Sequence, residues 1–289
     1  MFSYAEFTTR NLGFVSTAEQ EKLHAARVLI IGVGGMGGAA VQSLARAGIG
    51  SFALADIDTF EVSNLNRQVF ANLDTVDQHK AEATATQLRR INPEIELEVA
   101  GANWMSRIDE LLRRYPVVIN GMDDIGAGIE LYRRARKFGA TVVDAYTSPL
   151  PSVIVVRPED PRPEERLGYP SPGRDSATLD ADTKAACFMR EIEHVLVHSS
   201  TIKHIDLDVA MELVAGKRKR MSFAPMVITT GNLMAFEVVK LLLGRQPSAD
   251  FRGYFFNPWS MRTERPVPAL FAVPKRFIVR RFLAKMLRG

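Results

Sequence analysis

The sequence predicts an α/β protein with a doubly wound, mostly parallel sheet, a helical and loop insertion, and a basic amphipathic helix near its carboxyl end. Short apolar runs rich in Val and Ile alternate with helical patterns between about residues 27 and 156, the order of a parallel sheet covered by helices. A glycine-rich segment, 32–38, separates the first apolar run from the helix that follows it. A proline-rich stretch, 157–176, then interrupts the alternation.

The composition is that of a globular protein, with 46% hydrophobic and 24% charged residues in a chain of 289. This length allows one large domain or a domain with insertions. No apolar run approaches the roughly 20 residues that span a bilayer. The amino terminus has no basic segment followed by an apolar core, so we expect a cytoplasmic protein without a secretion signal. The single cysteine excludes an internal disulfide and any zinc site made only of cysteines within one chain.

The net charge of +4 is concentrated in the carboxyl-terminal tail. Six basic residues and no acid lie between Pro274 and Gly289, and the remaining chain has 31 bases against 33 acids. A slightly acidic body lacks the electrostatic footprint of a nucleic-acid-binding protein, which argues against nucleic acid as a partner.

The alternation of elements in residues 1–156 predicts one domain. A capping box at Ser16 and Glu19 begins a helix that runs to about Ala26. Buried strands are expected at 27–31, 51–55, 95–99, 117–120, 141–144 and 152–156. Helices are expected between them, at about 39–47, 78–91, 108–114 and 126–138. In such a sheet the ligand lies outside the carboxyl ends of the strands.

The rest of the chain divides into an insertion and a return to the same fold. Residues 157–224 are expected to form a crossover loop and helices at about 178–198 and 207–215, because five of the fifteen prolines fall within 157–176. Residues 225–289 continue the first fold with a strong apolar helix to about Leu243, closed by Gly244, and a strand at 253–257.

The tail from Arg276 to Leu287 has the pattern of a basic amphipathic helix. Ile278, Phe282 and Met286 recur at a spacing of four, and basic residues occupy much of the rest. We expect this helix to dock on the acidic body of the protein. Contact of residues 275–288 with an anionic membrane or an acidic partner is the alternative.

The glycine segment has the context of a phosphate-binding loop. Gly32 and Gly34 let backbone amides approach an anion, and the helix amino terminus adds a favourable dipole. Gly37 permits close helix–strand packing in this Rossmann-like arrangement. Asp56 ends the next strand, where a carboxylate accepts hydrogen bonds from ribose hydroxyls. Both NAD and ATP fit these residues.

Polar residues that follow Asp56 favour ATP over NAD. They are Asp58, Asn64, Asn66, Arg67 and Gln68, with Lys80 after them. A hydride-transfer site needs an apolar nicotinamide pocket and leaves these groups without a role, whereas charge that develops on a triphosphate is stabilised by fixed cations. Lys80 near a helix amino terminus opposes the helix dipole, so its position indicates a bound anion.

Five motifs together resemble the ubiquitin-activating-enzyme-like superfamily, especially its bacterial ThiF/MoeB group. They are Gly32-Val33-Gly34-Gly35-Met36-Gly37, Asp56-Ile57-Asp58, Asn64-Leu65-Asn66-Arg67-Gln68, Gln78-His79-Lys80-Ala81 and Val118-Ile119-Asn120-Gly121-Met122-Asp123. The resemblance covers about Arg10 to Val156, which makes 1–156 the expected ATP-binding domain, and a weaker match covers 224–244.

The resemblance implies an adenylyltransferase that uses ATP and Mg²⁺. A carboxylate, such as the carboxyl terminus of a ubiquitin-like or sulfur-carrier protein or of a peptide, attacks the α-phosphorus, and pyrophosphate leaves. The implied nucleotide-binding residues are Gly32, Gly34, Gly35, Gly37, Asp56 at the ribose, Asp58, Asn64 ordering the triphosphate and Gln68 supporting its loop. The implied catalytic residues are Arg67 and Lys80 on the phosphates and Asp123, which positions Mg²⁺ or the attacking group.

The resemblance also implies a homodimer. Arg10 resembles an arginine that members of the superfamily insert into the site of the partner subunit, a recurring device for stabilising phosphoryl charge. Asp124, next to Asp123, is expected to cap the helix that follows.

Some residues depart from the pattern of the superfamily. Many members hold a structural zinc through two Cys-x-x-Cys pairs, which this chain lacks, so we expect none. His194 and His198 share a helical face with His204 nearby, but the Glu of a zinc-protease motif is absent, and we expect exposed histidines. Cys187 is a candidate acyl acceptor, although its small apolar flanks fit a buried inert thiol better. The basic run 217–220 is expected to be a solvated loop, with contact to a substrate tail or an anion as the alternative.

Three other functions stay open at this point. The stretch from Ile49 to Pro93 also resembles the tRNA threonylcarbamoyladenosine dehydratase branch, although the acidic body counts against tRNA. An NAD-dependent oxidoreductase explains the glycines and Asp56 but leaves Arg67 and Lys80 without a role. A catalytically silent partner subunit would have lost phosphate-binding residues, and here they are all present.

Overall fold

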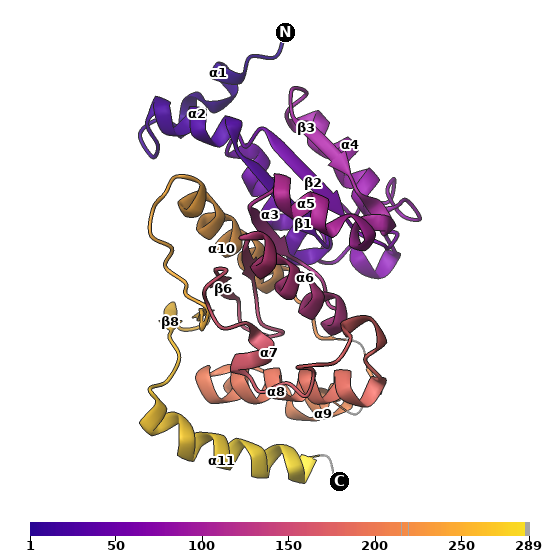
Figure 1. Cartoon of the computed structure of the whole chain (residues 1–289), viewed down its shortest axis with the longest axis vertical. Helices are drawn as coiled ribbons and strands as arrows, with labels where there is room; N and C mark the ends of the chain where they lie inside the picture. The colour runs from indigo at the N-terminus through magenta and orange to yellow at the C-terminus, as the bar shows by residue number, and fades with distance from the viewer. Residues whose placement is uncertain (215, 219, 287–289) are drawn as a thin grey trace.

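A single eight-stranded sheet organises the protein (Figure 1). The computed structural model describes residues 1–214, 216–218 and 220–286. The strand order is β3-β2-β1-β4-β5-β6-β7-β8. The strands are β1 Arg27–Ile31, β2 Ser51–Ala55, β3 Glu96–Val99, β4 Val117–Asn120, β5 Thr141–Asp144, β6 Ser152–Val156, β7 Tyr254–Asn257 and β8 Arg262–Glu264. The order reverses between β1 and β4, as in a doubly wound sheet.

The predicted parallel arrangement is confirmed for the first five strands, each of which pairs in parallel with its neighbours in this part of the sheet. The last three strands are antiparallel, because β6 runs against β5 and β7 runs against β6. The link between β5 and β6, residues 145–151, is shorter than the dozen or so residues that a parallel crossover requires. The sequence pattern showed the strand at 152–156 but not its direction.

Helices cover both faces of the sheet. They are α1 Tyr4–Thr8, α2 Thr17–Ala25, α3 Gly35–Arg46, α4 Lys80–Ile91, α5 Ile108–Arg114, α6 Ile125–Phe138, α7 Pro163–Arg166, α8 Ala181–His198, α9 Leu207–Val214, α10 Ala224–Leu242 and α11 Ala269–Met286. Alternate residues of β1 face opposite sides, so Val28 and Ile30 join a core with α3, α4 and α10, while Leu29 and Ile31 join another with α5 and α6.

Two helices begin at places that matter for the site. The helix expected at 39–47 starts four residues earlier, at Gly35, so the last glycines of the loop form its first turn. The helix expected from Gln78 starts at Lys80, which is buried. The capping box of α2 is confirmed, because the Ser16 hydroxyl accepts from the Glu19 amide and the Glu19 carboxylate accepts from the Ser16 amide.

Helix α10 is, among the described helices, the one long and apolar enough to cross a membrane by length and composition. The expectation that no segment approaches this length is wrong on that measure. Its side chains nevertheless bond within the protein: Asn232 Oδ1 accepts from the Ser43 hydroxyl at 2.5 Å, and the fully buried Glu237 accepts from Lys240 Nζ at 2.9 Å and from the Ser248 amide at 2.7 Å. These contacts hold α10 against α3 and the sheet.

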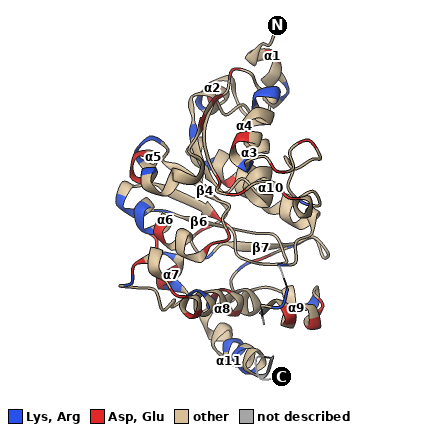
Figure 2. Cartoon of the chain, turned by 90° about the vertical axis from the view of Figure 1, so that its right-hand side faces the viewer, with Lys and Arg blue, Asp and Glu red and all other residues tan. Residues whose placement is uncertain are grey.

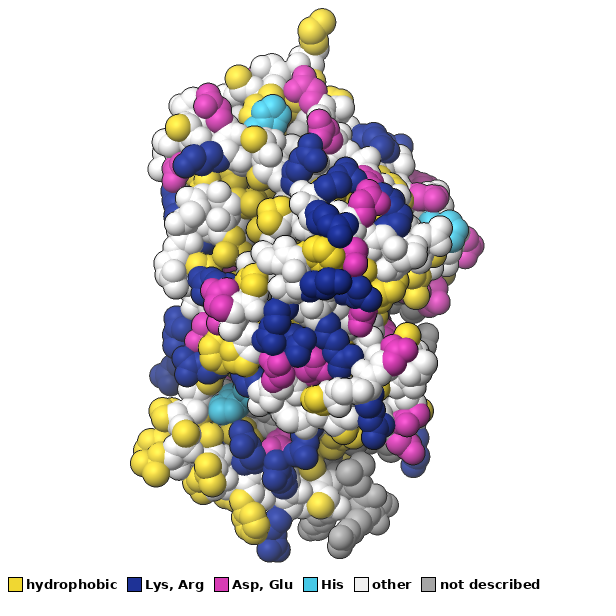
Figure 3. Space-filling view, viewed as in Figure 1, with side chains coloured by type: hydrophobic (Ala, Val, Ile, Leu, Met, Phe, Trp, Pro, Cys, Tyr) yellow, Lys and Arg dark blue, Asp and Glu magenta, His cyan; other side chains and the backbone are white. Residues whose placement is uncertain are grey.

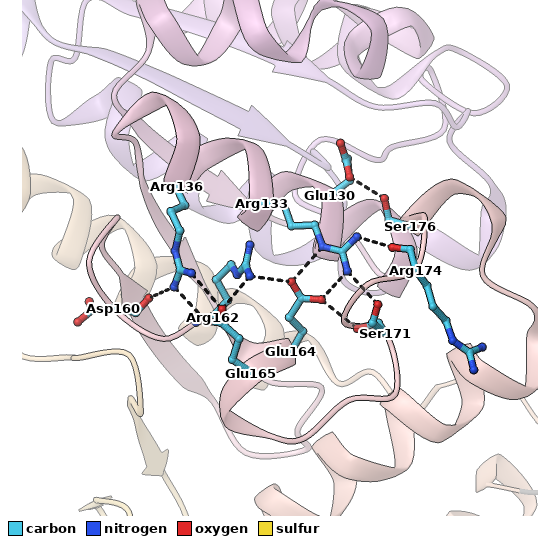
Figure 4. A network of polar contacts seen from close by, with 10 residues as sticks. All are labelled: Glu130, Arg133, Arg136, Asp160, Arg162, Glu164, Glu165, Ser171, Arg174 and Ser176. Carbon is cyan, nitrogen blue, oxygen red and sulfur yellow. Dashed lines mark hydrogen bonds and ion pairs between the residues drawn. The ribbon is translucent and has the colours of Figure 1, made fainter.

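A network of ion pairs ties the start of the insertion to α6 (Figure 4). Arg133 donates two hydrogen bonds to the buried Glu164, at 3.0 and 2.7 Å, and others to the backbone oxygens of Ser171 and Arg174. Arg136 forms a second bidentate pair with Glu165. The proline-rich stretch is therefore a loop as expected, but it is fixed and contains the short α7.

The carboxyl-terminal helix α11 packs on α8, at the end of the molecule away from α1 (Figures 1 and 2). Val279 and Leu283 are buried against Val197, and the carboxylate of Glu193 on α8 pairs with Arg276 and Arg280. Docking on the body is thus confirmed for the described residues, while Leu287 lies outside them. A second apolar set stays exposed on α11, where Figure 3 shows hydrophobic atoms gathered: Leu270, Phe271, Val273, Phe277 and Ile278.

Candidate active site

Three chain segments meet at one edge of the sheet. The glycine segment follows β1, Asp56 follows β2, and Gly121 to Asp123 follow β4. Because β1 lies between β2 and β4 in parallel, the carboxyl ends of all three strands are adjacent. The fold therefore brings the predicted residues at these strand ends together, as expected.

The glycines allow the backbones of two turns to touch. Gly32 has φ +86°, and a β-carbon there would lie 2.5 Å from the carbonyl carbon of Gly121. A β-carbon on Gly37 or on Gly121 would overlap the carbonyl oxygen of Gly32. Only glycine at these three positions permits this approach, which we call the glycine junction.

The first turn of α3 faces the same edge. Gly34 is the N-cap and offers no side-chain acceptor, so the first amides of the helix lack a side-chain cap. Gln68 packs against Gly34, and its buried Oε1 has no hydrogen-bond partner among the described residues. The uncapped helix start and the helix dipole fit a bound anionic group, whereas the acceptor Gln68 Oε1 fits a hydrogen-bond donor of a ligand.

Asp56 has the position of a ribose-binding carboxylate. Its two oxygens accept hydrogen bonds from the amides of Val33 and Asp58, at 2.8 and 3.0 Å, which fixes the side chain beside the glycine segment. Burial raises the pKa of the Asp56 carboxyl above its usual value. Each oxygen has further lone-pair capacity for hydroxyl donors.

Lys80 is 7% exposed, and its ammonium lies 2.9 Å from the carboxylate of Asp58. The backbone of Lys80 also donates to the Asp58 carbonyl at 2.9 Å, so the start of α4 is joined to the segment after β2. A buried lysine at this place supplies a fixed positive charge near the edge of the sheet.

Asn64 orders the loop that carries Arg67 and Gln68. Its side-chain oxygen accepts from the Glu61 amide at 3.0 Å, and its carbonyl accepts from the amides of Arg67 and Gln68. Arg67 donates to the Ser63 carbonyl at 2.8 Å and to Asn66 Oδ1 at 2.9 Å. The backbone of Arg67 also adjoins Gly35, at the start of α3.

The two neighbouring aspartates at the end of β4 have different environments. Asp124 caps α6 through the Ala127 amide at 2.7 Å and pairs with Lys184 at 2.9 Å, as the capping expectation requires. These contacts hold the pKa of the Asp124 carboxyl below its usual value despite partial burial. Asp123 is exposed, and its carbonyl oxygen accepts from Arg220 at 3.3 Å.

Arg10 lies far from the glycine segment of its own chain. Its neighbour Asn11 donates to the Ala47 carbonyl at the carboxyl end of α3, and Tyr4 donates to the Gly48 carbonyl. The glycine segment is at the other end of α3, whose 12 residues span about 18 Å. Arg10 is exposed at that remote end.

A polar pocket that the sequence reading missed extends from Asp123 to the end of β5. Asp144 lies in it and accepts from Asn120 Nδ2 at 2.9 Å, from the Tyr132 hydroxyl at 2.7 Å and from the Ala145 amide at 2.6 Å. Burial raises the pKa of the Asp144 carboxyl to about 7 and also raises that of Glu191. Asp144 ends a predicted strand beside the one that ends at Asn120, which was the available signal.

The remaining candidates lie away from this edge. The Cys187 thiol is fully buried with Ile129 and Tyr169, and burial raises its pKa. The expectation that His194 and His198 are exposed is wrong: both are buried, with the Tyr146 ring packed on His194 and the Val267 amide donating to His198 Nδ1 at 3.0 Å. Burial lowers their pKa values to about 2 and about 4. Within the described residues, no three His, Cys, Asp or Glu side chains form a group that could hold a metal ion.

Comparison with known proteins gives one family across most of the chain. The sequence model of the ThiF family matches residues 8–272. The sequence is 37% identical over 116 residues to the molybdopterin-synthase adenylyltransferase of Haemophilus influenzae, which covers 40% of this chain and 48% of that protein. It is 34% identical over 113 residues to the sulfur carrier protein ThiS adenylyltransferase of Escherichia coli, covering 39% and 45%. The matched region is thus about half the length of these relatives.

Solved structures share the fold. PaaA superposes with a TM-score of 0.63 at 22% identity, over 92% of this chain and 86% of that one. Escherichia coli MccB, solved with AMPCPP and MccA, superposes with a TM-score of 0.59 at 19% identity, over 87% and 67%. A further relative by sequence, the tRNA threonylcarbamoyladenosine dehydratase of Haemophilus influenzae, is 35% identical over 106 residues, covering 36% of this chain and 41% of that protein.

Proposed function

The chain belongs to the ThiF family, and on that premise we propose that it is an adenylyltransferase that transfers AMP from ATP to a carboxylate. The observation that carries the proposal is the set of groups around the glycine junction. An uncapped helix start, a buried lysine and a ribose-type carboxylate lie at adjacent strand ends. Relatives matched over part of their length are named as adenylyltransferases, which supports the same reaction.

The described residues fit a nucleoside triphosphate in named roles. Asp56 would accept hydrogen bonds from the ribose hydroxyls, and the first amides of α3 would bind phosphate oxygens. Lys80 and Arg67 would balance the charge of the triphosphate. The unpartnered Gln68 Oε1 would accept a hydrogen bond from a donor group of the ligand. Asn64 acts through the loop it orders.

The chemical step needs positioning more than proton transfer. A carboxylate oxygen attacks the α-phosphorus, the bond to the bridging oxygen of the β-phosphate breaks, and the electron pair leaves with pyrophosphate. Fixed cations stabilise the negative charge that develops on the phosphoryl oxygens. A bound Mg²⁺ would supply further charge neutralisation, and the exposed Asp123 would be the carboxylate that holds it.

We also propose that the active form is a homodimer, with Arg10 reaching the site of the second subunit. The location of Arg10 supports this, since it lies at the opposite end of α3 from its own glycine segment. The acceptor would be the carboxyl terminus of a small protein or peptide. A role in tRNA modification is the alternative, because one relative by sequence is a tRNA dehydratase.

Calorimetric titration tests the nucleotide assignment. The protein should bind AMPCPP with Mg²⁺ and should not bind NADH. Lys80→Ala and Arg67→Ala should each weaken AMPCPP binding by about 10-fold to 100-fold, since each removes a charged hydrogen-bond donor. The matched control is Lys22→Ala on exposed α2, which should bind as the wild type does. Binding of NADH alone would overturn the proposal and favour an oxidoreductase.

A further inference from the structure

Two cavities adjoin at the same edge of the sheet. The polar pocket described above contains Asp123 and Asp144. A second, apolar cavity lies beyond it, between the loop 147–149, α8, α9 and α11. Thr147 and Arg220 line both cavities, so the two are adjacent at these residues.

The apolar cavity has the size of one large side chain. Its volume is about 100 Å³, and a cavity of about 150 Å³ lined by Leu, Ile and Phe binds benzene. The walls are formed mainly by Phe188, Ile192, Leu196, Leu213, Met221 and Phe282. Such a lining favours an aliphatic or aromatic group over a polar one.

Arg220 lies where the cavities join. Its guanidinium donates to the Asp123 carbonyl at 3.3 Å and lies 5.6 Å from the ring centre of Phe188, a wall of the apolar cavity. The described residues of the basic run 217–220 are exposed and outside helices and strands, as expected for a solvated loop, and Arg220 makes these contacts in addition. A cation between the adenylation edge and an apolar cavity complements a carboxylate that carries an apolar group.

We propose that the apolar cavity binds one large apolar side chain at the carboxyl end of a peptide substrate, with Arg220 on the terminal carboxylate. This inference rests on the proposed adenylation for the fate of that carboxylate. Because Arg220 lines both the polar pocket and the apolar cavity, the bound apolar side chain belongs to the terminal residue of the peptide or to the residue before it. A terminus of two glycines would leave the cavity unfilled, so the structure favours a terminus such as Leu or Phe.

Titration with synthetic peptides in the presence of AMPCPP and Mg²⁺ tests the inference. The probes are N-acetylated pentapeptides of one sequence that end in Gly, Asp, Leu or Phe. Leu and Phe peptides should bind about 10-fold to 100-fold more tightly than the Gly peptide, the gain expected from burying such a side chain, and amidation of their carboxyl ends should remove most of it. Equal binding of all the peptides, or of none, overturns the inference. Tighter binding of octanoate than of the Leu peptide would assign the cavity to a free acid instead.

Two variants locate the effect. Ala210→Phe places a ring into the cavity from α9 and should abolish the preference for Leu over Gly while AMPCPP binding stays unchanged. Arg220→Ala should weaken the Leu peptide about 10-fold, whereas its matched control in the same run, Lys217→Ala, should not. If Ala210→Phe fails to fold by circular dichroism, the peptide series on the wild type still decides. Failure of the wild type to bind AMPCPP would contradict the proposed function. Binding of AMPCPP without a preference for the Leu peptide over the Gly peptide would contradict this inference alone.

Discussion

Asp144 lies at the carboxyl end of β5, where three donors converge on its carboxylate. Hydrogen bonds of this kind favour ionisation, but burial outweighs them and keeps the carboxyl neutral up to about pH 7. The same residue in the unfolded chain ionises near pH 4. The chemistry of the polar pocket therefore depends on pH in the physiological range.

The raised pKa of Asp144 predicts a loss of stability with rising pH. Between about pH 4 and about pH 7 the folded state keeps a proton that the unfolded state releases, so unfolding becomes more favourable by about 1.4 kcal/mol per pH unit. Urea unfolding of the wild type and of Asp144→Asn at about pH 5 and about pH 7 checks this. As the pH rises, the free energy of unfolding of the wild type should fall relative to that of the variant by up to about 1.4 kcal/mol for each pH unit. A difference in unfolding free energy between the two proteins that stays constant with pH would contradict the raised pKa.

At the level of single residues, the sequence reading located the groups that follow the strand ends but not those brought in by packing. Asp56 could be predicted because it directly follows the apolar run of β2, and Asp123 because it comes three residues after the β-branched run of β4. The burial of His194 and His198 depends on Val267, 69 residues after His198, and on Tyr146 in the loop before the insertion. A local sequence pattern does not predict contacts between residues that are this far apart in the chain.

Among the elements, the insertion is held in place by charge pairs on α6 (Figure 4). Glu164 is 3% exposed, accepts hydrogen bonds from Arg133 and Ser171, and forms an ion pair with Arg162 at 3.4 Å. Because Glu164 and Leu167 also line the polar pocket, this network fixes one wall of the candidate substrate site. This wall of the polar pocket is held rigidly because the ion pairs of the buried Glu164 are shielded from water.

Arg133→Met should therefore destabilise the protein strongly. The change leaves the buried Glu164 carboxylate without its bidentate partner, which costs about 3 kcal/mol. Urea unfolding measures the loss. The control is Arg252→Met, whose pair with Asp250 is exposed and should contribute less than about 1 kcal/mol. Equal effects of the two changes would show that the α6 network is no stronger than a surface pair.

Element boundaries could be predicted where a pattern was long and continuous. The runs at 27–31, 117–120 and 108–114 became β1, β4 and α5 with the expected bounds. The three-residue β8 was missed because it is too short to establish an alternating pattern, and the 3-10 helix at 101–107 because it lacks the 3.6-residue period of an α-helix. The direction of β6 is determined by the short segment that connects it to β5. Hydrophobic periodicity predicts a strand but does not predict its direction.

For the whole molecule, the separation of Arg10 from its own glycine segment predicts complementation between subunits. Arg10→Ala and Lys80→Ala should each lose most of the pyrophosphate release that an accepted carboxylate supports. Mixed dimers of the two should recover about a quarter to a half of it, because one composite site keeps both residues. Recovery is measured after co-expression with two affinity tags, and a mixed dimer as inactive as either parent would contradict an arginine acting in trans.

The glycine junction links the two halves of the proposed reaction. The bend after β1 and the bend after β4 touch through backbone atoms alone, without side chains that could yield between them. A displacement of one bend would therefore displace the other, so a phosphate group bound at the start of α3 would also affect the position of Asp123. The rigid glycine junction therefore favours an ordered kinetic mechanism, in which the nucleotide binds before its acceptor.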